Sequence, residues 1–112
     1  MSAVGYAVDR EHWGTMSLFV QMGNIYSEVG RSLNAKRQNN VQDRDYAVAR
    51  ALDLFDATVD PLIKRKSVRA KEVLRAKDQF LHAVYDEKST PSDMASIDRY
   101  FLQYAIAARL SR

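Results

Sequence analysis

Apolar side chains recur along the chain at three- and four-residue intervals, the spacing that places them on one face of an α-helix. Four such stretches are separated by short polar runs, and only four glycines and two prolines interrupt the sequence. This pattern favours helices over strands. We therefore expect an all-α chain, folded as an antiparallel up-and-down four-helix bundle that forms a single domain over residues 1–112.

The first predicted helix runs from Asp9 or His12 to Asn34, and the polar run 34–42 follows it as a loop. Its core stripe consists of Leu18, Met22, Ile25, Val29 and Leu33. The second predicted helix begins at Asp43, which can act as its N-cap, and ends before Pro61, because a proline disfavours the helical conformation in the preceding residue. Its core stripe consists of Val48, Leu52, Phe55 and Val59.

The third predicted helix covers about Val68 to Tyr85, and the segment 86–89 breaks it. Its core stripe consists of Val73, Leu74, Phe80, Leu81 and Val84. The fourth helix has the clearest start, since Thr90 can cap it, Pro91 fits its first position and Asp93 completes a capping-box pattern. Its core stripe consists of Met94, Ile97, Phe101, Tyr104, Ala105 and Ala108.

The last helix is apolar on a second face, which carries Leu102, Ile106 and Leu110. A helix buried both in its own bundle and against a partner has this pattern, so these residues are a candidate interface of a homodimer. The alternative is that they are ordinary exposed apolar residues near the end of the chain.

The composition limits the chemistry and the location of the protein. With 46% apolar residues the chain can bury one core, and no segment is apolar over the length needed to span a bilayer. Residues Met1 to Arg10 lack the pattern of a signal peptide, so we expect a cytoplasmic protein without a membrane partner. The absence of cysteine excludes disulfides, thiolate catalysis and cysteine-bound metals.

The chain is mildly basic, with 17 basic and 14 acidic residues. The cations concentrate between Lys64 and Lys77, where Glu72 is the only acid. Candidate anion-binding residues are Lys64, Arg65, Lys66 and Arg69. They lie at the start of a predicted helix, where the helix dipole disfavours cations, so helix stability does not explain them. They form either a solvated face or a contact with an anionic partner such as RNA or an acidic protein.

A helical wheel places Lys77 near the middle of the third core stripe, although a lone buried ammonium group is costly. It must reach solvent along its stem or meet a carboxylate inside the bundle. We hypothesise a polar network of Asn24, Glu28, Arg31, Asp56 and Lys77, extended by Arg50, Asp53, Glu72 and Arg75. Such a network is more often a device that fixes helix register than a catalytic site.

Several short motifs occur in an order that resembles a family of small, functionally uncharacterised bacterial and archaeal all-helical proteins. They are Gly23-Asn24-Ile25, Ser27-Glu28-Val29, Arg31, Arg50-Ala51-Leu52-Asp53-Leu54, Asp56, Thr58, Lys71-Glu72, Arg75, Lys77, Tyr100-Phe101, Tyr104 and Ala107-Ala108-Arg109. The resemblance covers nearly the whole chain and implies a basic residue at the place of Lys77. It implies no function.

Motifs of enzymes are weak in this sequence. No glutamate has a histidine three residues later, as ferritin-like dimetal sites need, and Asp53 with Asp56 is too sparse for a magnesium site. The spacing of Arg75 and His82 resembles the motif of HEPN ribonucleases, in which arginine would hold a phosphate and histidine would move a proton. Here Ala76 replaces the polar residue that commonly follows the arginine.

We therefore expect a non-enzymatic interaction or regulatory protein, with no metal and no cofactor. The alternative is a HEPN-like bundle directed at RNA or a nucleotide, such as a ribonuclease or a toxin–antitoxin component.

Overall fold

The computed structural model describes residues 8–110, which contain helices and no strand. The helices are α1 (Arg10–Gly14), α2 (Leu18–Arg37), α3 (Val41–Lys64), α4 (Arg69–Tyr85) and α5 (Pro91–Leu110). The prediction of an all-α chain is confirmed. Most of the segment considered for a signal peptide, residues 1–7, lies outside the described residues.

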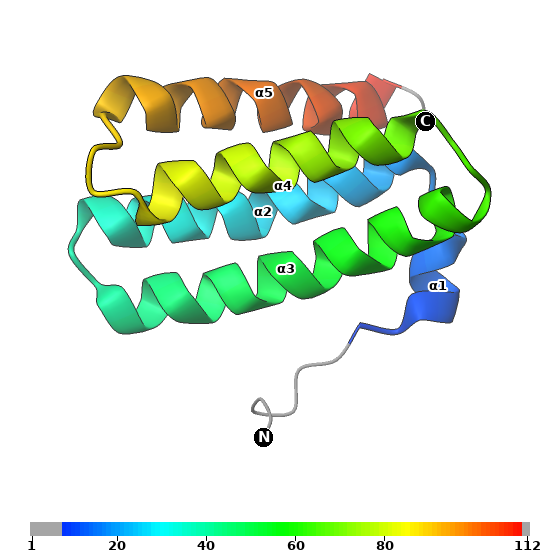
Figure 1. The fold of residues 1–112 in the computed structure, drawn as a ribbon, viewed down its shortest axis with the longest axis horizontal. Helices are drawn as coiled ribbons and strands as arrows, with labels where there is room; N and C mark the ends of the chain where they lie inside the picture. The colour runs from blue at the N-terminus through cyan, green and yellow to red at the C-terminus, as the bar shows by residue number, and fades with distance from the viewer. Residues whose placement is uncertain (1–7, 111–112) are drawn as a thin grey trace.

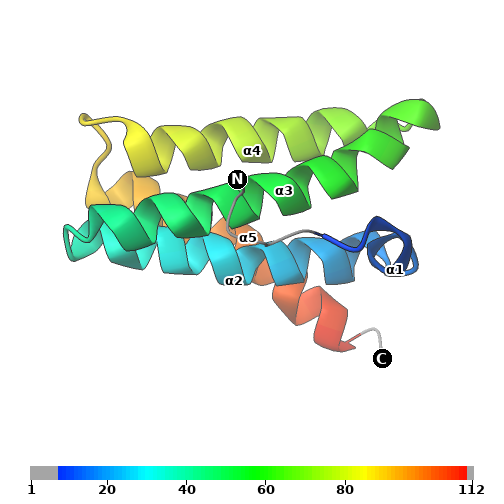
Figure 2. The same ribbon diagram turned by 90° about the horizontal axis from the view of Figure 1, so that it is seen from below.

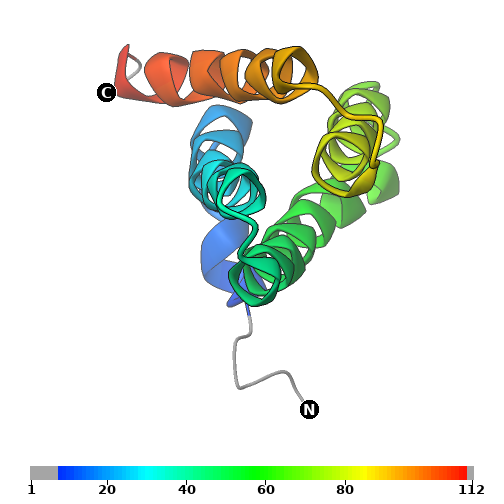
Figure 3. The same cartoon turned by 90° about the vertical axis from the view of Figure 1, so that its left-hand side faces the viewer.

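In Figure 1 the chain runs from right to left along α2 and α4 and from left to right along α3 and α5, and Figures 2 and 3 show that α5 crosses the other long helices at a marked angle. Helix α2 packs against α3 and α5, and α4 packs against α3 and, over a smaller area, against α5. The short helix α1 packs against α3 at one end of the long helices (Figure 2). Over residues 8–110, no helix has the length and apolar character needed to cross a membrane.

Three phenylalanines from three helices meet at the centre of the core. Phe55 of α3 lies with its ring centroid 6.1 Å from that of Phe80 of α4 and 5.9 Å from that of Phe101 of α5, and all three side chains are fully buried. Helix α2 closes this core with Met22, Ile25, Val29 and Leu33, which are also fully buried. Packed aromatic rings of this kind contribute strongly to core stability because each buries a large apolar surface.

The first predicted helix is two helices in the structure, and the second of them continues to Arg37, beyond the expected end at Asn34. Helix α1 ends at Gly14, and Ser17 caps α2 by accepting a hydrogen bond from the backbone N–H of Val20 at 3.2 Å. The break lets α1 turn so that Trp13 is buried with 6% of its surface exposed. The apolar stripe of a continuous helix would not have brought this indole into the core.

The second predicted helix begins earlier and ends later than expected. Asn40, and not Asp43, is the N-cap of α3, since its side chain accepts a hydrogen bond from the backbone N–H of Asp43 at 3.1 Å. Pro61 does not end the helix, which continues to Lys64. Proline has no N–H to donate, and its ring crowds the carbonyl of the preceding turn. The helix continues nevertheless, because the carbonyl of Pro61 accepts from the N–H of Arg65 at 3.0 Å and Leu62 is buried in the core.

The expected start of α5 is present, because Thr90 and Asp93 exchange the two hydrogen bonds of a capping box, at 2.9 and 3.2 Å. The core face of α4 differs from the expectation. Its centre is formed by Ala76 and Phe80, both buried, whereas Leu74 is 38% exposed. The buried face of α4 is formed partly by alanines. A helical-wheel prediction that follows only the large apolar residues therefore places the core face of α4 at the wrong angle.

Candidate functional site

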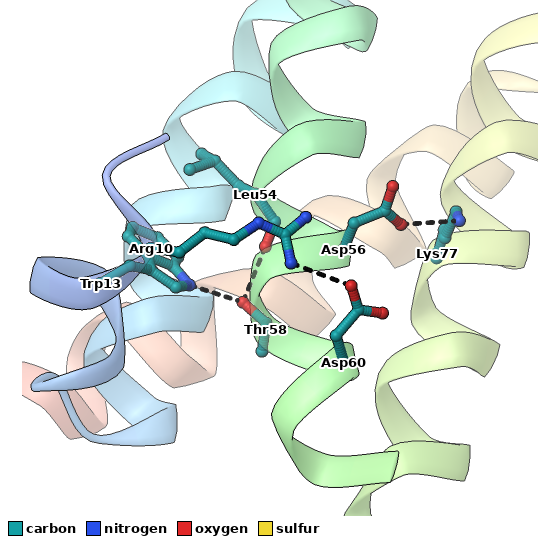
Figure 4. A network of polar contacts seen from close by, with 7 residues as sticks. All are labelled: Arg10, Trp13, Leu54, Asp56, Thr58, Asp60 and Lys77. Atoms are coloured by element: carbon teal, nitrogen blue, oxygen red, sulfur yellow. Dashed lines mark hydrogen bonds and ion pairs between the residues drawn. The ribbon is translucent and has the colours of Figure 1, made fainter. Parts of the chain in front are cut away.

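The residues of the predicted polar network form separate contacts in the structure. Glu28 of α2 pairs with Arg50 of α3 at 3.5 Å, between Oε2 and a guanidinium nitrogen. Asp56 of α3 pairs with Lys77 of α4 at 3.3 Å, between Oδ1 and Nζ (Figure 4). The two pairs join different helices, the first α2 to α3 and the second α3 to α4.

The other members of that predicted network take no part in these two ion pairs, although Arg31 lines a hollow together with Arg50. Asn24 is exposed and its amide contacts the sulfur of Met16 at 3.6 Å. Arg31 and Asp53 are exposed on α2 and α3. One side-chain oxygen of Glu28, Oε1, is buried and has no hydrogen-bond partner among the described residues. The structure therefore gives Lys77 one of its two candidate carboxylates, Asp56, and pairs the other candidate, Glu28, with Arg50.

Lys77 lies at the edge of the contact between α3 and α4 and not in the core. Its side chain is 26% exposed and that of Asp56 is 48% exposed, so both charged groups keep contact with water. A pair exposed to this degree contributes little stability because water screens the attraction. The pair is consistent with a role in the pairing of α3 with α4, and the cost of a buried ammonium group does not arise.

The α4–α5 groove, defined by the two hollows between these helices, contains both Arg75 and His82. Arg75 lines a hollow of about 460 Å³ with Tyr100 and Tyr104, and His82 lines a hollow of about 360 Å³. Gln79 lines both hollows. Arg75 and His82 therefore border the same groove, one in each hollow.

Hydrogen bonds order the side of this groove that carries Arg75. The hydroxyl of Tyr104 donates to the carboxylate of Glu72, and the hydroxyl oxygen atoms of Tyr100 and Tyr104 lie 3.1 Å apart. Because Tyr104 donates its proton to Glu72, the hydroxyl of Tyr100 is the donor to Tyr104. Burial, followed by the hydrogen bond to Glu72, raises the pKa of Tyr104 well above its usual value, so this phenol stays protonated.

The groove is poorly suited to cleave RNA. The imidazole of His82 pairs through Nδ1 with Asp86 at 3.0 Å, and Asp78 and Asp93 line the same hollow. These carboxylates would repel the phosphate that a ribonuclease must hold.

The four candidate anion-binding residues surround the turn between α3 and α4. Lys64, Arg65, Lys66 and Arg69 are all exposed. Lys64 lies in the last turn of α3, where the helix dipole favours a cation. The argument that helix stability cannot explain these cations is therefore wrong for Lys64, although it still holds for Arg69 in the first turn of α4.

The expected interface residues of α5 point away from the other helices. Leu102, Ile106 and Leu110 are 41%, 47% and 80% exposed. The C-terminal half of α5 extends past α2 (Figure 3), and beside it a groove of about 560 Å³ is lined by Phe19 and Gly23 of α2 and by small residues of α5. The outward face of α5 is therefore open to a partner.

Sequence reasoning missed the close approach of α2 and α5. A Cβ atom at Gly23 would lie 3.3 Å from the Cα atom of Ala105, which is closer than ordinary packing allows. At Gly30, about two turns further along α2, a Cβ would meet nothing within 4 Å. In the sequence, this close approach is indicated only by the presence of a glycine in α2 and of several alanines in α5.

No group of three or more histidine, aspartate or glutamate side chains within residues 8–110 could hold a metal ion. No protein-family model matches the chain, and no curated protein or solved structure is significantly similar to it.

Proposed function

We propose that this chain is a non-enzymatic interaction or regulatory protein that forms a homodimer through α5. In this proposal α2 to α5 constitute an antiparallel up-and-down four-helix bundle, the protein is cytoplasmic, and it belongs to the small helical family that its sequence resembles. The observation that carries the proposal is the apolar strip of Leu102, Ile106 and Leu110. These side chains are spaced by four residues, so they form one continuous strip on the exposed side of α5.

A second copy of the chain fits this strip because a two-fold axis across α5 pairs the strip with itself. The end of α5 that extends past α2 allows another α5 to approach without a clash with the rest of the bundle (Figure 3). Exposed polar side chains, Arg99, Gln103 and Arg109, border the strip. An apolar centre with a polar border is the usual composition of a protein interface.

The HEPN-like alternative has weaker support. Arg75 and His82 line separate hollows, and carboxylates lie beside the histidine. Loss of RNA cleavage on His82→Ala would favour this alternative, whereas the absence of cleavage by the native protein would exclude it.

The dimer is tested by sedimentation equilibrium of the native chain and of two lysine variants. Ile106→Lys places a charge in the strip and should give a monomer. Leu74→Lys is the matched control, because Leu74 is exposed to a similar degree, 38% against 47%, but lies on α4 outside the strip. Native protein that is monomeric at micromolar concentrations, or equal association of both variants, would contradict the proposal.

Salt separates this proposal from RNA binding. Association through an apolar strip should change little between low and high salt, whereas binding to RNA weakens steeply as salt displaces phosphate contacts. Size-exclusion chromatography with and without added RNA at two salt concentrations measures both effects. A complex with RNA that disappears at high salt, with no dimer at either salt, would support the alternative function.

A further inference from the structure

The turn between α3 and α4, residues 63–69, has a conformation that does not suit the residue at its centre. Helix α3 ends in a Schellman motif, in which the N–H of Ser67 donates to the carbonyl of Leu62 at 2.9 Å and the N–H of Lys66 donates to that of Ile63 at 3.0 Å. This motif places Lys66 in the left-handed region, with φ at 56°. Glycine or asparagine is favoured at this position, and lysine is strained there.

The end of α2 provides an internal comparison. It closes with the same two hydrogen bonds, from Asn40 to Ala35 and from Asn39 to Lys36, and the left-handed residue is Asn39, with φ at 57°. One turn of this protein thus carries a residue that suits the conformation and the other carries a cation. The local backbone does not account for lysine at position 66.

Exposed apolar side chains share this turn with the cations. Val68 is 88% exposed and Ile63 is 52% exposed. The turn lies at the end of the molecule, at the outermost part of α3 and α4 in Figure 2. An apolar side chain exposed to this degree at a protruding position does not stabilise the fold, because little of its surface is removed from water.

The cations of the turn form no ion pair inside the protein. None of Lys64, Arg65, Lys66 and Arg69 pairs with a carboxylate of residues 8–110. Arg69 does contact the fold through its guanidinium group, which lies 5.8 Å from the ring centroid of Phe19 and keeps its positive charge there. The nearest acid in the sequence before the turn, Asp60, is paired with Arg10 at 2.9 Å (Figure 4). The turn therefore presents four positive charges around two apolar side chains.

We propose that the α3–α4 turn docks on the surface of a membrane that contains anionic lipids. The four cations contact the acidic headgroups, and Val68 and Ile63 enter the boundary between headgroups and acyl chains. A lipid surface suits a protruding turn, because it accepts apolar side chains without a preformed groove. RNA would use the cations but would leave Val68 in water, and an apolar segment of a partner protein would need a concave surface.

This proposal differs from the expectation that the protein has no membrane partner. That expectation rested on the lack of a segment able to span a bilayer, which does not bear on attachment to its surface. The proposal is also independent of the dimer, because the α5 strip and the α3–α4 turn share no residue.

The test measures flotation of the protein with vesicles of phosphatidylcholine alone and with vesicles that also contain phosphatidylglycerol. We expect binding only to the anionic vesicles, with weaker binding at high salt. Lys66→Asn removes one cation and gives this turn the residue found in the turn after α2. It should weaken binding about fivefold without lowering Tm, since each cation near an anionic membrane contributes a similar amount.

Val68→Ser removes the apolar contact and keeps every charge. It should weaken vesicle binding several-fold, whereas binding to single-stranded RNA, if any, should not change. Matched controls lie at the opposite end of the molecule: Lys88→Gln removes a cation, and Val41→Ser removes an apolar side chain that is 56% exposed. Neither control should change vesicle binding.

Three results would overturn the proposal. The first is no flotation with anionic vesicles at low salt. The second is equal loss of binding in the variants of the turn and in their controls. The third is binding to RNA that Lys66→Asn weakens and Val68→Ser does not, with vesicle binding unaffected by either, which would identify the turn as a nucleic-acid contact.

Discussion

The hydroxyl group of Thr58 holds the short helix α1 against α3 (Figure 4). It accepts a hydrogen bond from the indole N–H of Trp13 at 3.0 Å and donates to the carbonyl of Leu54 at 2.8 Å. Trp13 and Thr58 are 6% and 2% exposed, so water cannot replace the bond without local opening. Thr58→Val keeps the shape of the side chain and removes the acceptor.

We expect Thr58→Val to lower the free energy of unfolding by about 1–3 kcal/mol, the cost of a buried donor left without a partner. For a domain of this size, each kcal/mol corresponds to a change in Tm of about 4 °C. Thermal unfolding followed by circular dichroism should therefore give a Tm about 4–12 °C lower. Because Trp13 is the only tryptophan, its fluorescence reports separately whether α1 has detached from α3.

A double-mutant cycle isolates the hydrogen bond from the effects of packing. Trp13→Phe removes the N–H group, so Thr58→Val should cost almost nothing further in that background. If the substitution costs the same with tryptophan and with phenylalanine at position 13, the hydrogen bond does not hold α1, and the reasoning is refuted.

Gly30→Ala should raise stability by about 1 kcal/mol through helix propensity, because its methyl group meets nothing. Gly23→Ala should bring no gain in Tm, since its methyl group would press on the backbone of α5; equal gains at both sites would contradict the close approach. Lys77→Met should change the free energy of unfolding by less than about 1 kcal/mol, because water screens the ion pair of Lys77 with Asp56. A loss of about 2 kcal/mol in denaturant unfolding would show that this pair contributes more than an exposed ion pair does. The hydrogen bond from the Thr90 N–H lowers the pKa of Asp93 below its ordinary 3.8, so the carboxylate stabilises the fold above that pH and less as the pH falls through the lowered pKa. Asp93→Asn should therefore lower Tm at pH 7 and match the native chain in acid, and a constant difference across pH would exclude the charge as its cause.

The sequence by itself determined the features that depend on neighbours a few residues apart. The helical spacing of apolar residues is a property of the local backbone, and the all-α fold followed from it. The capping box at Thr90 and Asp93 links two residues three positions apart, and both of its hydrogen bonds are present. The core residues of α2 were also predicted well, because one continuous stripe defines its buried face.

Only the tertiary structure decided the features that depend on distant residues. The break between α1 and α2 lets Trp13 reach Thr58, which lies 45 positions away in the sequence. The passage of α3 through Pro61 is supported by the burial of Leu62 between helices. The hydrogen bond of Trp13 and the burial of Leu62 stabilise these features only after the helices have packed. Helix ends predicted from neighbouring residues therefore cannot take them into account.

The candidate sites show the same division most clearly. The sequence selected polar residues near the helix faces, but it could not tell that Glu28 would meet Arg50 while Asp56 met Lys77. Each residue turns the direction of a helix face by about 100°, so a small rotation of one helix changes which side chains meet. That rotation is set by packing against all neighbours together, and small residues such as Gly23 and Ala76 determine how closely the helices approach.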